Sequence, residues 1–121
     1  MNEERMDSQI EQLIKQVRAF NRERDWDQFH SPKNLSMGLS IEAAEILEIF
    51  QWLTEEQSKV LSAEALSRLE EEIGDVMIYL ISLADRFGLD PAVLAANKLT
   101  INAQRYPADL VRGKAKKYTE Y

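Results

Sequence analysis

The chain has 121 residues, of which 45% are hydrophobic and 30% are charged, a balance typical of a folded globular domain rather than of a disordered chain. Its net charge of −6 argues against a protein that binds the backbone of nucleic-acid polymers, because such proteins carry an excess of basic residues. With no cysteine and one histidine, the sequence excludes disulfides, thiolate metal sites and zinc sites built from several histidines.

Membrane and secretion signals are missing from the sequence. No apolar run is long enough for a membrane span, and residues 1–24 are too polar for a signal peptide. We therefore expect no membrane partner and a cytoplasmic location. Because there is also no internal repeat and no linker, residues 1–121 are predicted to form a single helical domain.

Apolar residues recur at helical spacing in four segments, which indicates an all-α protein. These segments are residues 8–24, 31–53, 63–87 and 90–103. A polar turn at 54–62 joins the second to the third, and residues 104–121 are expected to form an irregular basic tail. The pattern predicts an antiparallel four-helix bundle. Residues 76–84 (VMIYLISLA) are apolar almost all round, so we expect this helix to be covered in a homo-oligomer.

The second predicted helix carries a carboxylate within its apolar stripe. Glu42 lies on the face formed by Leu35 and Ile46, and Glu45 lies at the edge of that face. A carboxylate that faces a core is costly unless its charge is compensated. Two carboxylates on adjacent turns also repel each other. We therefore expect a cation to lie between Glu42 and Glu45.

A second acidic pair, Glu72 and Asp75, has the same spacing in the third predicted helix. A short connection predicts that the second and third helices are antiparallel, with the two pairs at similar distances from the turn. Four converging carboxylates would form an all-oxygen site suited to Mg²⁺ or Mn²⁺. The alternative is that these residues are ordinary acidic side chains on a solvated face. Neither helix has the Glu-x-x-His pattern of a di-iron bundle.

The sequence resembles the MazG-type all-α nucleoside triphosphate pyrophosphohydrolases, whose ExxE…ExxD pattern is matched by the two acidic pairs. Four further segments, in order, are similar to the dCTP pyrophosphatase branch of that family. They are RDWDQFHSPKN at 24–34, FQW at 50–52, DVMIYL at 75–80 and KLTINAQRYPADLVRGKAKKYTE at 98–120. One departure is Val17, where some members of this branch carry a histidine on the first helix, and this difference bears on the base preference.

The resemblance implies hydrolysis of a nucleoside triphosphate, dCTP or a modified dCTP, to the monophosphate and pyrophosphate with Mg²⁺. It also implies a homotetramer, a dimer of dimers, whose active sites are completed between subunits. The implied metal ligands and catalytic residues are Glu42, Glu45, Glu72 and Asp75. The implied nucleotide pocket is lined by Trp26, His30, Trp52, Tyr79, Lys98, Asn102 and Tyr106.

The chemistry of the residues implied for the pocket agrees with a nucleotide ligand. If the fourth helix extends far enough, one of its faces carries cations and an amide that suit a polyphosphate and a sugar hydroxyl. The residues of that face are Lys98, Asn102, Arg105 and Tyr106. Trp26 and Trp52 could sandwich a base. The alternatives are core packing for either tryptophan, an ordinary loop contact for His30 and solvated charge for the tail.

Three functions remain open at this point: an enzyme, a nucleotide-binding module without catalysis, and a structural helical oligomer. An intact set of four carboxylates favours the enzyme, because a sensor could lose its metal ligands. A carboxylate that is not fully committed to a metal could act as the base toward water, and we expect Glu45 to take this role.

Overall fold

The computed structural model describes residues 6–115 and 118–120, and the chain divides into two compact units, Met1–Leu89 and Asp90–Tyr121. The first unit contains α1 (Gln9–Glu23), α2 (Pro32–Phe50), α3 (Glu55–Ser58) and α4 (Ala63–Asp85). The second contains α5 (Pro91–Arg105), α6 (Ala108–Val111) and the 3₁₀ turn η1 (Tyr118–Glu120). Every regular element in the described ranges is helical, which confirms the all-α prediction.

Local capping signals start the long helices at the predicted residues. The Ser31 hydroxyl accepts a hydrogen bond from the backbone N–H of Asn34 at 3.1 Å, and Pro32 takes the first helical position. Ser62 caps α4 in the same way, by accepting from the N–H of Ala65 at 3.1 Å. Because a cap depends only on neighbouring residues, sequence reasoning located these starts correctly.

The ends of two helices differ from the prediction. The second helix ends at Phe50, three residues before the predicted end at residue 53. Thr54 is the reason, because it adopts an extended conformation as the N-cap of α3 and forms a capping box with Gln57. Helix α4 ends at Asp85 rather than at residue 87, and the turn that follows closes at Gly88, whose φ is +66°.

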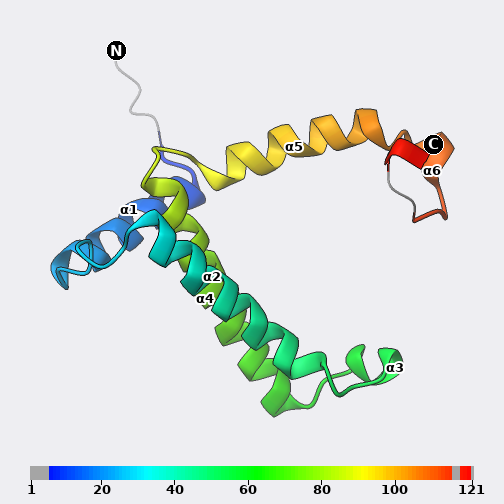
Figure 1. Cartoon of the computed structure of the whole chain (residues 1–121), viewed down its shortest axis with the longest axis horizontal. Coiled ribbons are helices and arrows are strands. Elements are labelled where there is room, and N and C mark those ends of the chain that lie inside the picture. The colour runs from blue at the N-terminus through cyan, green and yellow to red at the C-terminus, as the bar shows by residue number, and fades with distance from the viewer. Residues whose placement is uncertain (1–5, 116–117, 121) are drawn as a thin grey trace. The chain divides into compact units, whose positions relative to one another are not determined.

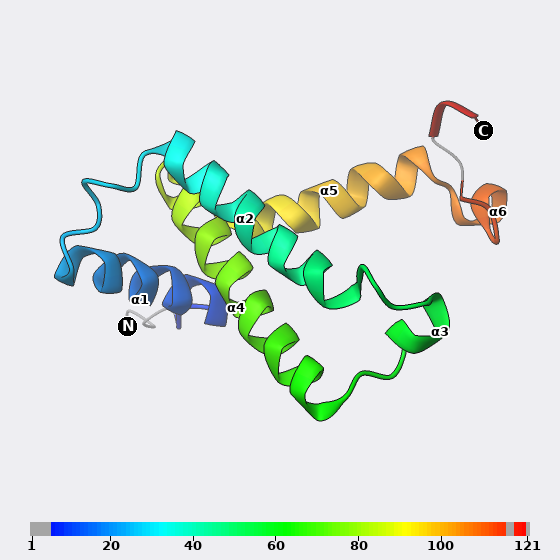
Figure 2. The same cartoon turned by 60° about the horizontal axis from the view of Figure 1, so that its bottom comes forward.

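Within the first unit, α2 and α4 run antiparallel side by side and α1 packs against α4 (Figures 1 and 2). The residues buried in this core are Val17, Leu35, Ile49, Ile81 and Ala84. The fourth helix of the predicted bundle, α5, belongs to the second unit, so the four-helix arrangement stays a prediction. None of the helices in the described ranges is long and apolar enough to cross a membrane.

In the second unit, α5 extends to Arg105, two residues beyond the predicted end. Lys98, Asn102 and Arg105 are therefore on one helix at spacings of four and three residues, which places them on one face. Tyr106 is the C-cap, and its backbone N–H donates to the carbonyl of Asn102 at 2.8 Å. The predicted irregular tail, residues 104–121, instead contains α6 and η1.

Candidate functional site

Three of the predicted carboxylates meet between α2 and α4. Glu42 and Glu45 come from adjacent turns of α2, and Glu72 comes from α4. Each offers one oxygen atom, and these atoms lie within 4.8 Å of one another. Mg²⁺ binds oxygen ligands at about 2.0–2.1 Å, so oxygens on opposite sides of one ion are about 4 Å apart. Small movements of partly buried side chains would therefore close this group around one ion.

The electrostatics of the cluster also fit a hard cation. One oxygen of Glu42 and one of Glu72, both Oε2, are buried and have no hydrogen-bond partner in the described part of the chain. Burial, followed by the Glu45 carboxyl, raises the pKa of Glu42. A hydrogen bond with Glu45, followed by burial, raises the pKa of Glu72 to about 7. A bound cation would compensate these costs, because it supplies both the missing partner and the opposite charge.

Asp75, the fourth predicted ligand, lies outside this close group among the residues described. It is exposed and lies about one turn of α4 beyond Glu72. Its negative charge adds to the effects of burial and Glu45 in raising the pKa of Glu42, so it is near the cluster. Asp75 also lines the pocket beside the cluster, and it therefore links the acidic group to that pocket.

This pocket has a volume of about 240 Å³ and is mainly aromatic and apolar. The side chains that shape it include Phe20, Trp26, His30, Leu35, Asp75 and Tyr79. The Trp26 ring meets Phe20 edge to face, with centroids 5.6 Å apart, and lies 6.2 Å from the His30 ring. Flat apolar walls beside a few polar groups are typical of sites that bind small planar ligands. The structure thus brings together three of the predicted pocket residues, Trp26, His30 and Tyr79.

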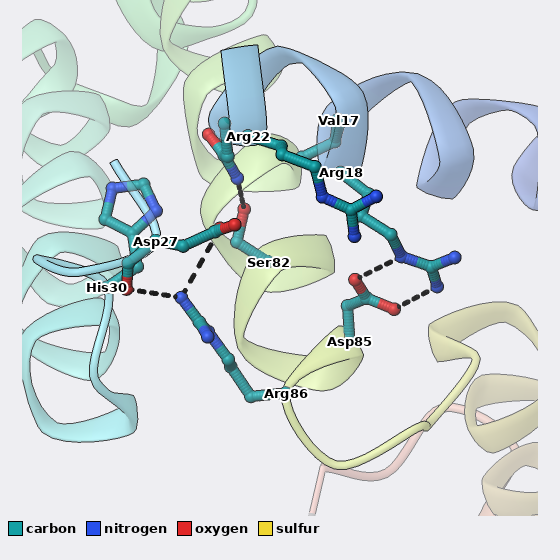
Figure 3. A pocket seen from close by; sticks show the side chains of 9 residues that line it. Val17, Arg18, Arg22, Asp27, His30, Ser82, Asp85 and Arg86 are labelled. Carbon is teal, nitrogen blue, oxygen red and sulfur yellow. Dashed lines mark hydrogen bonds and ion pairs between the residues drawn. The ribbon is translucent and has the colours of Figure 1, made fainter. Parts of the chain in front are cut away.

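One ion pair holds the loop that carries Trp26 and His30, and a second joins α1 to α4 beside it (Figure 3). Arg86 donates to the backbone carbonyl of Asp27 in this loop at 2.9 Å, and its guanidinium lies 3.6 Å from the Asp27 carboxylate. Arg18 on α1 binds Asp85 on α4 through two hydrogen bonds of 2.6 and 3.0 Å. The hydrogen bond from Arg18 lowers the pKa of Asp85. Both charged pairs line a second, polar cavity of about 240 Å³ next to the aromatic pocket, and they brace the wall between the two.

Sequence reasoning missed a buried polar pair that lines the aromatic pocket. The Asn21 side-chain amide donates to the Ser82 hydroxyl at 3.3 Å, and both residues are buried. Both also line the aromatic pocket. The available signal was Ser82 itself, a small polar residue within the apolar run of residues 76–84, because a buried hydroxyl needs a partner.

Trp52 does not lie with the other predicted pocket residues. It follows the C-terminal end of α2, and its side chain is 86% exposed. Trp26 and His30 precede the other end of this helix, whose 19 residues span about 28 Å at ~1.5 Å per residue. One copy of the chain therefore does not bring Trp52 to the pocket that Trp26 lines, and the sandwich of one base by these two residues stays a prediction that needs a second subunit.

The remaining predicted residues belong to the second unit. Lys98, Asn102 and Arg105 lie along α5, and Tyr106 caps it. The predicted face required the fourth helix to reach residue 106, and α5 meets this condition for the first three residues but ends before Tyr106. Their role toward the acidic cluster stays a prediction.

The fold and the acidic cluster together define a known class of protein. The sequence profile of the MazG-like family matches residues 38–121, and the chain belongs to this family. This finding confirms the resemblance seen in the two acidic pairs. Among the relatives of the chain is dCTP pyrophosphatase 1 of Homo sapiens, which is 41% identical over 113 residues. The Mus musculus protein of the same name is also 41% identical over 113 residues.

These matches cover 92% of this chain and 66% of each mammalian protein, so the chain spans slightly less than two thirds of their length. The fold is similar to the crystal structure of a pyrophosphatase from Archaeoglobus fulgidus DSM 4304, with a TM-score of 0.75 and 36% identity. That similarity covers 88% of this chain and 99% of the archaeal one.

Proposed function

We propose that this chain is a cytoplasmic, Mg²⁺-dependent nucleotide pyrophosphohydrolase. It converts a nucleoside triphosphate, dCTP or a modified dCTP, to the monophosphate and pyrophosphate. The observation that carries the proposal is the pair of buried, unpartnered oxygens of Glu42 and Glu72 beside an aromatic pocket. A carboxylate cluster suits a metal–phosphate complex, and the adjoining pocket suits a base. The relatives named dCTP pyrophosphatase 1 support this substrate class.

The four carboxylates divide the chemistry between them. Glu42, Glu45, Glu72 and Asp75 would hold Mg²⁺, or Mn²⁺, and the ion would supply positive charge against the phosphates. Glu45 is the proposed base that removes a proton from the attacking water. The water oxygen forms a bond to the α-phosphorus, and the bond from that phosphorus to the bridging oxygen breaks. Pyrophosphate leaves with the electrons of that bond.

The rest of the substrate would be held by two groups of residues. Trp26, His30 and Tyr79 would contact the base in the aromatic pocket. The side chains on the shared face of α5 and at its C-cap would bind the phosphates and the sugar. This second group consists of Lys98, Asn102, Arg105 and Tyr106.

We also propose that the enzyme is a homotetramer, a dimer of dimers. In the described single chain, Met77, Ile78 and Leu80 on α4 remain 43%, 43% and 42% exposed, although they belong to an apolar run. A helix that is apolar on several sides needs covering on several sides. In such an assembly the exposed Trp52 of one subunit would complete a pocket of another subunit.

Light scattering tests the assembly directly. At micromolar concentration we expect a mass near four times the 14.0 kDa of one chain. The replacement Ile78→Glu would place a charge on the exposed apolar face and lower this mass. A wild-type mass of one chain would contradict the tetramer and any active site shared between subunits.

Pyrophosphate release from a panel of nucleoside triphosphates tests the function. With Mg²⁺ we expect pyrophosphate and monophosphate in equal amounts, fastest with dCTP or its 5-substituted forms, and no turnover in EDTA. Binding of dCTP without turnover would indicate a nucleotide sensor instead. If the wild type neither binds nor cleaves any triphosphate, the chain is a structural oligomer and the proposed enzyme is wrong.

A further inference from the structure

A glycine in the middle of α2 has no conformational reason to be there. Gly38 lies six residues into a helix of 19 residues, and its φ is not positive. Glycine is the weakest helix former apart from proline, so an alanine at this position would favour α2 locally. The reason for Gly38 must therefore lie in what its missing side chain leaves room for.

That space is occupied by the ring of Tyr79 from α4. A Cβ atom added to Gly38 would lie 2.3 Å from Cε1 of this ring and 2.9 Å from Cδ1 and Cζ. Separations below 3.0 Å do not occur for real Cβ atoms, so the ring would have to move. The ring thus packs directly against the backbone of α2, which only glycine allows.

The same ring forms part of the wall of the aromatic pocket. Because it contacts the α2 backbone and also lines the cavity, a displacement from α2 reshapes the cavity. Leu35, one turn before Gly38 on α2, lines the pocket as well. The distance between the Tyr79 ring and α2 therefore helps to set the width of the pocket.

We propose that Gly38 is a positioning residue that determines which bases the pocket accepts, by letting the Tyr79 ring lie close against the backbone of α2. This inference rests on the proposed function, since it assigns the pocket to the base of the nucleotide. Gly38 itself touches no substrate and acts only through the Tyr79 ring. Its effect should therefore appear in the binding of the base and not in the hydrolytic step.

The variant Gly38→Ala tests the proposal. We expect KM for dCTP to rise about tenfold, with kcat within about twofold of the wild type, because one aromatic contact is lost. For 5-methyl-dCTP, whose base is larger, the rise in KM should be greater. Calorimetry should show the same loss in the affinity for dCMP, which lacks the phosphoanhydride bond that the reaction breaks. Unchanged KM values and an unchanged dCMP affinity would overturn the proposal.

Gly74→Ala is the matched control, because a Cβ at Gly74 on α4 meets nothing within 4 Å. It carries the same gain in helix propensity, and its KM and base preference should stay at wild-type values. Equal effects of Gly74→Ala and Gly38→Ala would show that helix propensity rather than the Tyr79 contact is responsible, and this too would overturn the proposal.

The double variant Gly38→Ala/Tyr79→Ala separates the clash from other causes. Without the ring, adding a Cβ at Gly38 should leave KM at the value of Tyr79→Ala alone, and thermal stability should not fall, since only the gain in helix propensity remains. If Gly38→Ala does not fold, recovery of folding in the double variant supports the contact, and failure to recover overturns it. A wild type that neither binds nor cleaves nucleotides would instead refute the proposed function and, with it, this role for the pocket.

Discussion

Replacing Glu72 with glutamine is expected to abolish metal-dependent hydrolysis while raising the thermal stability of the metal-free protein at pH 8. The Glu72→Gln side chain keeps its size but removes one charge from a cluster whose ligand atoms lie within 4.8 Å. Repulsion among the remaining carboxylates falls, so the metal-free fold gains stability. Loss of a ligand weakens the stabilisation of phosphate charge, and we expect a fall in kcat/KM of about a hundredfold or more.

The pH dependence of the stability of the metal-free protein shows, without an activity assay, whether the charge of Glu72 is destabilising. The folded protein raises the pKa of Glu72 to about 7, above its ordinary value of 4.5, so the folded state binds a proton that the unfolded chain does not. In EDTA the wild type should therefore become more stable as the pH falls from 8 to 5. Asp85, whose pKa is lowered, loses its stabilising contribution only below its ordinary value of 3.8. Glu72→Gln should flatten the dependence between pH 8 and 5.

Thermal melts in EDTA at pH 8, 7 and 5, and calorimetric titration with Mg²⁺ and Mn²⁺, measure both effects. Glu71→Gln is the control, because Glu71 is the exposed neighbour of Glu72 on α4 and lies outside the cluster. It should keep metal binding, activity and the wild-type pH dependence of stability. Undiminished Mg²⁺ affinity and activity in Glu72→Gln would show that the metal assignment is wrong.

Replacing Trp26 with alanine is expected to raise KM for dCTP by about ten- to a hundredfold, the range that corresponds to one stacked base. The ring is 42% exposed and lines the aromatic pocket, so it can present a face to a ligand. Because triphosphate charge is the same in every nucleotide, the preference for dCTP over a purine triphosphate should also fall. The fold should survive, since Trp26 lies in a surface loop.

Lys98→Ala provides the contrast, because its ammonium group can recognise charge but not base identity. It should lower kcat/KM for dCTP and for a purine triphosphate by the same factor. Measuring both substrates in each variant separates the two kinds of contact. If Trp26→Ala leaves KM and the preference unchanged, the pocket that it lines does not bind the base.

Much of the secondary structure was determined by the sequence alone, because its signals are local. Helices α2, α4 and α5 begin at Ser31, Ser62 and Asp90, whose side chains accept hydrogen bonds from N–H groups two or three residues further along the chain. Apolar spacing also indicated that Leu35 faces the core, where it is buried. The family was indicated by the resemblance of the two acidic pairs together with the segments at 24–34, 50–52, 75–80 and 98–120, and the match of residues 38–121 to the MazG-like family confirms it.

Only the tertiary structure decided which of these residues meet. Three carboxylates come together across α2 and α4 while Asp75 lines the neighbouring pocket, because the packing of two helices and not spacing along one helix sets these distances. The contact of Gly38 with Tyr79 likewise joins residues that are 41 positions apart on two helices, and the space between them depends on how closely the helix backbones approach.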